Sequence, residues 1–273
     1  MSVLAQASLQ AVADLLGRVR LACSLGTGDH DPCRRDAHDT CQPQPSPPPH
    51  GPRLRSVPGR GAQARIELDE ALDLTRTGDV WLFRGRKPAD RAIQLSTNSP
   101  VNHVGMALVV EDLPPLMWHA ELGRSLQDVW SGTHHRGVQL HDLREAVLVW
   151  SRRYDQRPWL RQLEPEANRE MEDAALRCVA RLDGTPFPSS VQLASRWLRG
   201  RASSLLRHPG SARDLETAYC AEVVAVTYQE MGLLADSRSP SWYDPGRFWS
   251  GDDLVLECGA RLGGEIAVTV PVA

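Results

Sequence analysis

The sequence predicts an α+β fold in which an antiparallel sheet is followed by two helices. Between residues 78 and 150, short apolar runs are separated by turn residues. After Pro165, apolar residues recur at helical spacing, and a second stretch of this kind ends at Gly232. Strands grouped before helices are typical of α+β domains. We therefore expect one such domain at residues 66–273.

Five strands are expected in the first half of this domain. Gly78 and Asp79 form a turn before an apolar run that Gly85 ends, and an acidic, proline-containing turn separates two later runs. The predicted strands cover residues 80–84, 103–110, 116–121, 137–143 and 146–150. One or two short strands are expected near 254–257 and 265–270. The sheet should be an antiparallel meander.

Two helices are expected after these strands. The first opens at Pro165, ends at Gly184 and places its apolar residues on one face. The second begins at Tyr219 or Cys220, if Thr217 is its N-cap, and it stops at Gly232. Cys220 would then lie in the first turn of the second helix.

The first 65 residues differ in composition from the rest of the chain. Residues 1–22 have apolar side chains at roughly helical spacing, so we expect an amphipathic helix that could contact a membrane surface. Residues 23–65 are rich in Pro, Gln, Gly and Arg and predict a disordered linker. The cysteines at 23, 33 and 41 lack the close spacing of a structural zinc site.

Composition excludes several classes of function. The chain has 31 basic and 34 acidic residues, giving a formal charge of −3, without the basic stripe of a nucleic-acid binder. Charged residues interrupt the segment 3–21, which therefore lacks the apolar core of a signal peptide or a membrane span. The positions of the six cysteines do not resemble a disulfide framework. These features favour a cytoplasmic protein with no nucleic-acid partner.

Cys220 is the candidate nucleophile. The unpaired N–H groups and the dipole at the start of a helix stabilise a thiolate, and they can also stabilise the oxyanion formed when a thiolate attacks a carbonyl. A cysteine in an apolar helix is more often a packing residue, as we expect Cys178 to be. A suitable base close to Cys220 would favour a catalytic role over a packing role for this cysteine.

His103 is the candidate base. It opens a predicted strand whose next residues on the same face, Gly105 and Ala107, are small and leave room for an imidazole. A third polar group should orient this base. The neighbouring strand offers His119 and, two residues further on, Glu121, and we favour His119.

Two other chemistries compete with this interpretation. Five histidines lie within the predicted sheet, at 103, 119, 134, 135 and 141, but they lack the H-x-H or H-E-x-x-H spacing of a zinc site. A serine hydrolase is disfavoured because no G-x-S-x-G motif occurs. We therefore predict no metal and no cofactor.

Three segments taken in order resemble a known family. They are LTRTGDVWLF at 74–83, NHVGM at 102–106 and YCAEVV at 219–224, and RLDGTPF at 181–187 adds to the match. They resemble the circularly permuted NlpC-type hydrolases, the YiiX- and YaeF-like relatives of the lecithin retinol acyltransferases. In that family the histidine precedes the cysteine in the chain, as it does here. The resemblance covers about residues 66 to 270.

The resemblance implies a permuted papain-like fold and a thiol enzyme. Cys220 would be the nucleophile, His103 the base, and His119 or Glu121 the third polar residue. The expected function is a cysteine hydrolase that cleaves an amide or ester through a thioester. Its substrate would be a peptide, a cell-wall peptide or an acyl lipid. Two alternatives are a lipid-directed acyltransferase or lipase, with Trp242 and Trp249 at a membrane surface, and a binding module that has lost activity.

Overall fold

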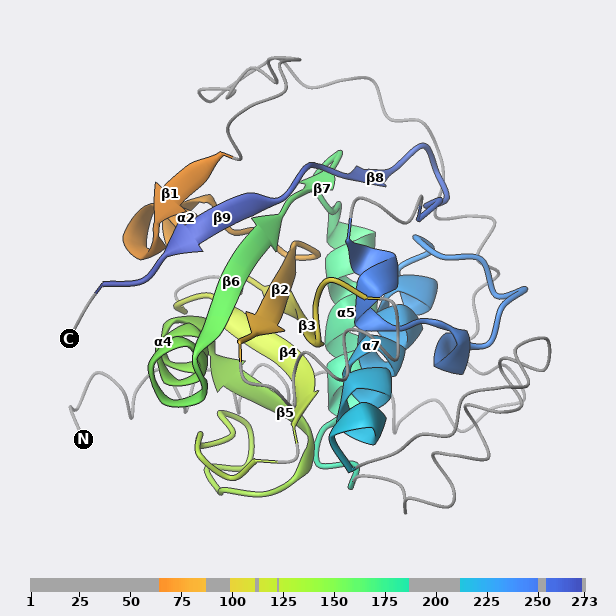
Figure 1. Cartoon of the computed structure of the whole chain (residues 1–273). Helices are drawn as coiled ribbons and strands as arrows, with labels where there is room; N and C mark the ends of the chain where they lie inside the picture. The colour runs from red at the N-terminus through yellow and green to blue at the C-terminus, as the bar shows by residue number, and fades with distance from the viewer. Residues whose placement is uncertain are drawn as a thin grey trace.

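A computed structural model describes residues 64–86, 99–110, 113–121, 123–186, 212–249 and 254–271. These residues form an α+β domain (Figure 1). The predicted helix at 1–22 and the linker at 23–65 lie almost wholly outside the described residues. In the described part of the chain, no helix is long and apolar enough to span a membrane.

A seven-stranded sheet forms the centre of the domain, in the order β1-β9-β6-β2-β3-β4-β5. Neighbouring strands are antiparallel, except that β1 and β9 are parallel, so the sheet is mixed and not purely antiparallel as predicted. The strands are β1 (Arg65–Glu67), β2 (Val80–Gly85), β3 (His103–Leu108), β4 (Leu116–Glu121), β5 (Gly137–Asp142), β6 (Gln156–Arg161) and β9 (Ile266–Thr269). A separate two-stranded sheet pairs β7 (Leu163–Glu164) with β8 (Arg261–Leu262).

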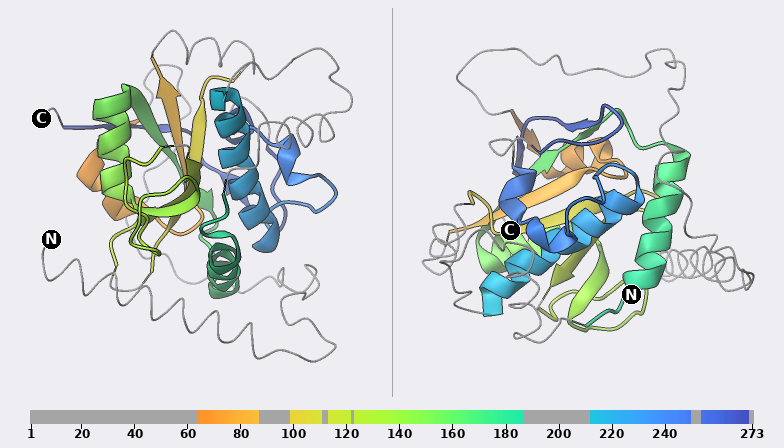
Figure 2. Two further views of the ribbon diagram at one scale, coloured as in Figure 1. Left: turned by 90° about the horizontal axis from the view of Figure 1, so that it is seen from below. Right: turned by 90° about the vertical axis from the view of Figure 1, so that its right-hand side faces the viewer.

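Helices cover both faces of the sheet (Figure 2). On one face lie α5 (Arg169–Leu182) and α7 (Ala212–Glu230). On the other face lie α2 (Leu68–Leu74) and α4 (Leu143–Tyr154). Two short 3-10 helices, η1 (Pro240–Trp242) and η2 (Pro245–Phe248), follow α7.

Alternation along each strand divides the core between these faces. In β3, Val104 and Met106 join the hydrophobic cluster beneath α7, whereas Ala107 joins the cluster beneath α4. The same alternation in β4 places Trp118 toward α7, where its indole N–H donates to the hydroxyl of Thr227 at 3.0 Å. Odd-numbered residues of β3 and β4 therefore face α4.

Several predicted elements are wrong in type or extent. Residues 146–150, predicted as a strand, lie within helix α4, which Asp142 caps by accepting a hydrogen bond from the backbone N–H of Glu145. Helix α5 begins at Arg169, after an Asn168 cap, and not at Pro165. No strand forms at the described residues of 254–257. Helix α7 begins at Ala212, well before the Thr217 cap that the sequence suggested.

Candidate functional site

Three histidines from three adjacent strands form a hydrogen-bonded row. Nε2 of His103 lies 3.1 Å from Nδ1 of His119, and Nε2 of His119 lies 2.8 Å from Nδ1 of His141. Nε2 of His141 lies 3.1 Å from Oε1 of Gln139, which ends the row. The structure thus brings together the predicted base, His103, and the favoured third residue, His119.

Gln139 sets the direction of every hydrogen bond in this row. Its side-chain oxygen can only accept, so His141 donates from Nε2 and is left with a lone pair on Nδ1. If the rings are neutral, His119 must then donate from Nε2 to His141, and His103 from Nε2 to His119. The amide orientation is consistent, because Nε2 of Gln139 lies 3.4 Å from the carbonyl oxygens of Glu121 and Gly137. Nδ1 of His103 is therefore left with a lone pair.

The row is buried beneath Trp150 of α4. The ring of Trp150 meets those of His103 and His119 nearly edge to face, at centroid distances of 4.5 and 4.7 Å. Phe83 packs against the same indole at 4.6 Å. His103 is 6% exposed, and the rest of the row is at most 1% exposed. Apolar walls on this side thus keep water away from the imidazoles.

Burial keeps the three imidazoles neutral. Burial, together with the positive charge that His141 would carry, lowers the pKa of His103 to about 3. Burial is also the main cause that lowers the pKa of His141 to about 4, although Asp128 opposes it. The pKa of His119 falls well below its usual value for the same reason, burial beside two other histidines. The neutral row assumed above is therefore the form expected near pH 7.

The strand pattern explains why these side chains meet. His103 pairs with Phe83 across β2 and β3, so both point toward α4. Gly105 is the next residue of β3 on that face, and a Cβ there would lie 3.3 Å from the Cβ of His119 and 2.3 Å from Sδ of Met117. The small residue expected beside His103 therefore makes room for the side chains of β4.

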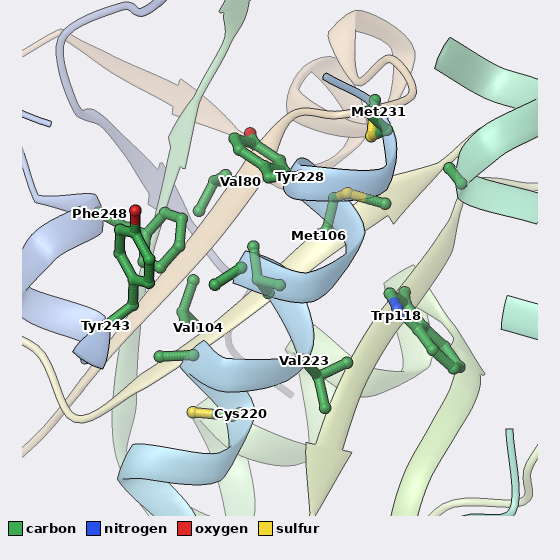
Figure 3. Close-up of a cluster of buried hydrophobic side chains, with 14 of the residues drawn as sticks. Val80, Val104, Met106, Trp118, Cys220, Val223, Tyr228, Met231, Tyr243 and Phe248 are labelled. Atoms are coloured by element: carbon green, nitrogen blue, oxygen red, sulfur yellow. The ribbon is translucent and has the colours of Figure 1, made fainter. Parts of the chain in front are cut away.

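Cys220 is fully buried and belongs to the hydrophobic cluster between the sheet and α7, together with Val104 and Val223 (Figure 3). Since α7 begins at Ala212, Cys220 lies in its third turn and not in its first. A backbone N–H at that depth bonds within the helix. The predicted stabilisation of a thiolate and an oxyanion by the start of this helix is therefore wrong for the helix as it stands.

Cys220 nevertheless lies level with the start of β3. The hydroxyl of Tyr228 donates to the carbonyl of Gly78, whose N–H donates to the carbonyl of Ala107, so Tyr228 is level with Ala107. Going back along α7 from Tyr228 to Cys220 covers about 12 Å. Going back along β3 from Ala107 to His103 covers about 13 Å. Figure 3 accordingly shows Cys220 beyond Val104, at the end of α7 that is remote from Met231.

The side chains of Cys220 and His103 leave their elements on different sides of the sheet. Val104 points toward α7 and Cys220, whereas His103 points toward α4, and the hydrogen bond of the His103 ring goes to His119. The structure thus joins His103 to His119 directly and brings Cys220 to the same end of the sheet.

Glu121 lies on the same face of β4 as His119. One ligand atom from each of His119, Glu121 and His141 can be chosen so that all three lie within 4.8 Å of one another, and all three residues are buried. This trio could hold a metal ion. Of the other histidines, His135 has its Nε2 3.5 Å from Asp128, and His134 is exposed.

Sequence reasoning missed His141, Gln139 and Trp150 as members of the site. The sequence presents His141 only as one of five possible metal ligands. His141 follows Gln139 by two residues along β5, so both side chains lie on the same face of the strand. This spacing was a usable signal. Trp150 was assigned to a strand, so its position over the histidines could not be foreseen.

No protein-family model matches the chain, and no curated protein matches it. Among solved structures, the chain is similar to the crystal structure of the metalloprotein YiiX from Escherichia coli O157:H7, at 21% sequence identity and a TM-score of 0.38. The match covers 57% of this chain and 66% of that chain, slightly under two thirds of its length. We draw no conclusion about the permuted papain-like arrangement from so distant a likeness, and it stays a prediction.

Proposed function

We propose that this chain is a thiol hydrolase or acyl-transfer enzyme, with Cys220 as nucleophile, His103 as base and His119 as the residue that orients the base. The observation that carries the proposal is the histidine row, which leaves Nδ1 of His103 as a proton acceptor. A neutral imidazole held by a second polar group is what a cysteine nucleophile needs.

The row also supplies a way to spread positive charge. When Nδ1 of His103 takes the thiol proton of Cys220, its Nε2 proton can move to Nδ1 of His119, and the Nε2 proton of His119 can move to His141. Gln139 cannot take a further proton, so the charge stays among the three rings. The negative thiolate offsets the cost of an imidazolium at this buried site.

The reaction then has two stages. The thiolate attacks the carbonyl carbon of an amide or ester, and the leaving group departs with the proton from His103, which leaves a thioester on Cys220. Water or another acceptor gives a proton to His103 and attacks the thioester, which releases the acyl product and restores the thiol. The substrate class we propose is a peptide, a cell-wall peptide or an acyl lipid.

The geometry favours a hydrolase over the lipid-directed alternative. Trp242 and Trp249 are half-buried, and the guanidinium groups of Arg238 and Arg247 lie 4.3 and 4.1 Å from the ring centroid of Trp242. Trp249 packs against Trp159 at 5.5 Å. These contacts occupy indole surface that a membrane-facing residue would present to lipid.

Alkylation of Cys220 tests the proposal without knowledge of the substrate. Cys178 is a matched control, because both cysteines are buried and neither is in a disulfide, and burial raises the pKa of the Cys178 thiol. We expect iodoacetamide to modify Cys220 at least tenfold faster than Cys178 at pH 7.5, by peptide mass mapping. His103→Gln should remove this difference. Equal rates in the wild type, or an unchanged difference in His103→Gln, would refute the pairing.

A substrate screen then separates an enzyme from an inactive binding module. Acyl peptides, lipid esters and muropeptides are offered to the wild type and to Cys220→Ala, and intact mass is recorded for a trapped thioester. Turnover that Cys220→Ala abolishes is the expected result. A slow-reacting Cys220 together with no turnover of any class would favour the binding module.

A further inference from the structure

We propose that His119, Glu121 and His141 form a binding site for one divalent transition metal ion, with zinc as the best match. The site goes beyond the proposed thiol chemistry and does not depend on it. Two imidazoles and one carboxylate are a ligand set that zinc uses widely, whereas calcium and magnesium prefer oxygen ligands alone. The sequence spacing concealed this set because its members come from two strands.

The positions of the ligand atoms fit a metal ion. Zinc binds nitrogen and oxygen ligands at about 2.0–2.2 Å, so ligand atoms around one ion lie roughly 3–4 Å from one another. One atom from each of the three residues already lies within 4.8 Å of the other two. Nε2 of His119 and Nδ1 of His141 lie 2.8 Å apart, so a small separation of the rings would admit the ion between them.

The surroundings hold the two imidazoles as they would be held in a metal site. Ligating histidines usually donate their other ring N–H to a fixed acceptor. His141 donates from Nε2 to Oε1 of Gln139, which keeps its Nδ1 as a lone pair. The other nitrogen of His119 is held by His103 at 3.1 Å. Each imidazole therefore has one nitrogen fixed by a neighbour and one turned toward the other ligand.

Gly123 positions the carboxylate of Glu121. A Cβ at residue 123 would lie 2.2 Å from Oε1 of Glu121 and 2.9 Å from its carboxyl carbon. The carboxylate therefore passes closely beneath the backbone of Gly123, and any larger residue would displace it. Because the ligand atoms are buried, water cannot easily compete for the ion.

Metal binding would require the protons of the histidine row to move to other ring nitrogens. In the metal-free row, the Nε2 proton of His119 occupies the space between His119 and His141. With an ion in that space, His119 binds through Nε2 and carries its proton on Nδ1, donating to Nε2 of His103. His103 then carries its own proton on Nδ1. The three rings keep three protons, so the change needs no other reactant.

Direct titration of the full chain tests the site. Protein freed of metal by a chelator is titrated with Zn²⁺ by calorimetry and with Co²⁺ by visible absorption. We expect one saturable Zn²⁺ per chain at this site. His141→Gln and Glu121→Gln should each weaken its affinity at least tenfold, and His134→Gln, which changes an exposed histidine outside the trio, should not change it.

Gly123→Ala keeps the experiment decisive if a ligand variant fails to fold. It retains all three ligands and displaces only the carboxylate, so it should also weaken Zn²⁺ binding, with folding checked by circular dichroism. No saturable binding, an affinity unchanged in folded Glu121→Gln, His141→Gln or Gly123→Ala, or Co²⁺ spectra dominated by thiolate ligands would each overturn the site. Because binding is read directly, absence of thiol activity would not affect the result.

Discussion

Asp79 should make the domain less stable as pH rises toward 8. Its side chain is fully buried just before β2, where one carboxyl oxygen accepts from the backbone N–H of Leu163 and the other from that of Arg76, each at 2.8 Å. Burial nevertheless dominates and raises the pKa of this carboxyl to about 7. The folded protein therefore holds a proton that the unfolded chain gives up near pH 3.8.

The sign and size follow from linkage. Because the folded-state pKa is raised, the stabilisation from the protonated carboxyl is fully present below about pH 4 and is lost as pH rises through about 7. The slope approaches about 1.4 kcal/mol per pH unit below pH 7 and levels off above it, which gives roughly 2 kcal/mol between pH 5.5 and 8.5. The neutral amide of Asp79→Asn cannot titrate, so this contribution should vanish from that variant.

Urea unfolding followed by tryptophan fluorescence from pH 5.5 to 8.5 measures the effect. Asp79→Asn also loses an acceptor, which lowers its stability by the same amount at every pH, whereas the contribution of the protonated carboxyl belongs to the wild type alone and is lost as pH rises. The difference between the two free energies of unfolding should shrink by about 2 kcal/mol as pH rises. Parallel curves for the two proteins would refute the raised pKa.

Three further substitutions test the packing around the site by the same unfolding assay. Trp150→Ala should cost about 3–5 kcal/mol because it removes the indole over the histidines, whereas Trp150→Phe should cost clearly less; equal losses would contradict this role. Gly137→Ala should cost more than Gly184→Ala, since both glycines have positive φ (123° and 71°) but only at Gly137 would a Cβ meet backbone, 2.2 Å from the carbonyl oxygen of Thr185. Thr227→Val should cost about 1–3 kcal/mol because the buried Trp118 N–H loses its acceptor, and Thr227→Ser should retain most of the stability. A valine variant as stable as the serine variant would contradict the role of that hydrogen bond.

The strands that have clear turn signals could be predicted from the sequence. Helix α4 could not be predicted from residues 146–150 alone. Residues 146–150 form an apolar run that resembles a strand when taken alone. Over residues 143–154 the buried positions are Leu143, Ala146, Val147 and Trp150, which is helical spacing. Asp142 and Glu145 also have the spacing of an N-terminal capping signal. The longer window contained the correct answer.

Two of the three histidines in the row, His103 and His119, could be predicted as neighbours, because they lie on adjacent strands and alternation fixes the face of each side chain. The contribution of β5 depends on strand register, which sequence does not specify. In the structure His119 pairs with Gln139 and Met117 with His141, so both β5 side chains fall beside His119. The start of α7 was missed for a different reason. Thr217 is a good cap residue, but the helix already begins before it, at Ala212.

His119 belongs both to the proposed base and to the proposed metal site, and the two uses exclude each other. As part of the base, His119 accepts at Nδ1 from His103 and leaves Nδ1 of His103 free to take the thiol proton. As a metal ligand through Nε2, it must donate from Nδ1, which forces the proton of His103 onto its own Nδ1, the nitrogen that the proposed mechanism uses as the acceptor. A bound ion would thus convert His103 from an acceptor into a donor while leaving Cys220 itself unchanged. The direction of two hydrogen bonds therefore determines whether this row can serve as a base.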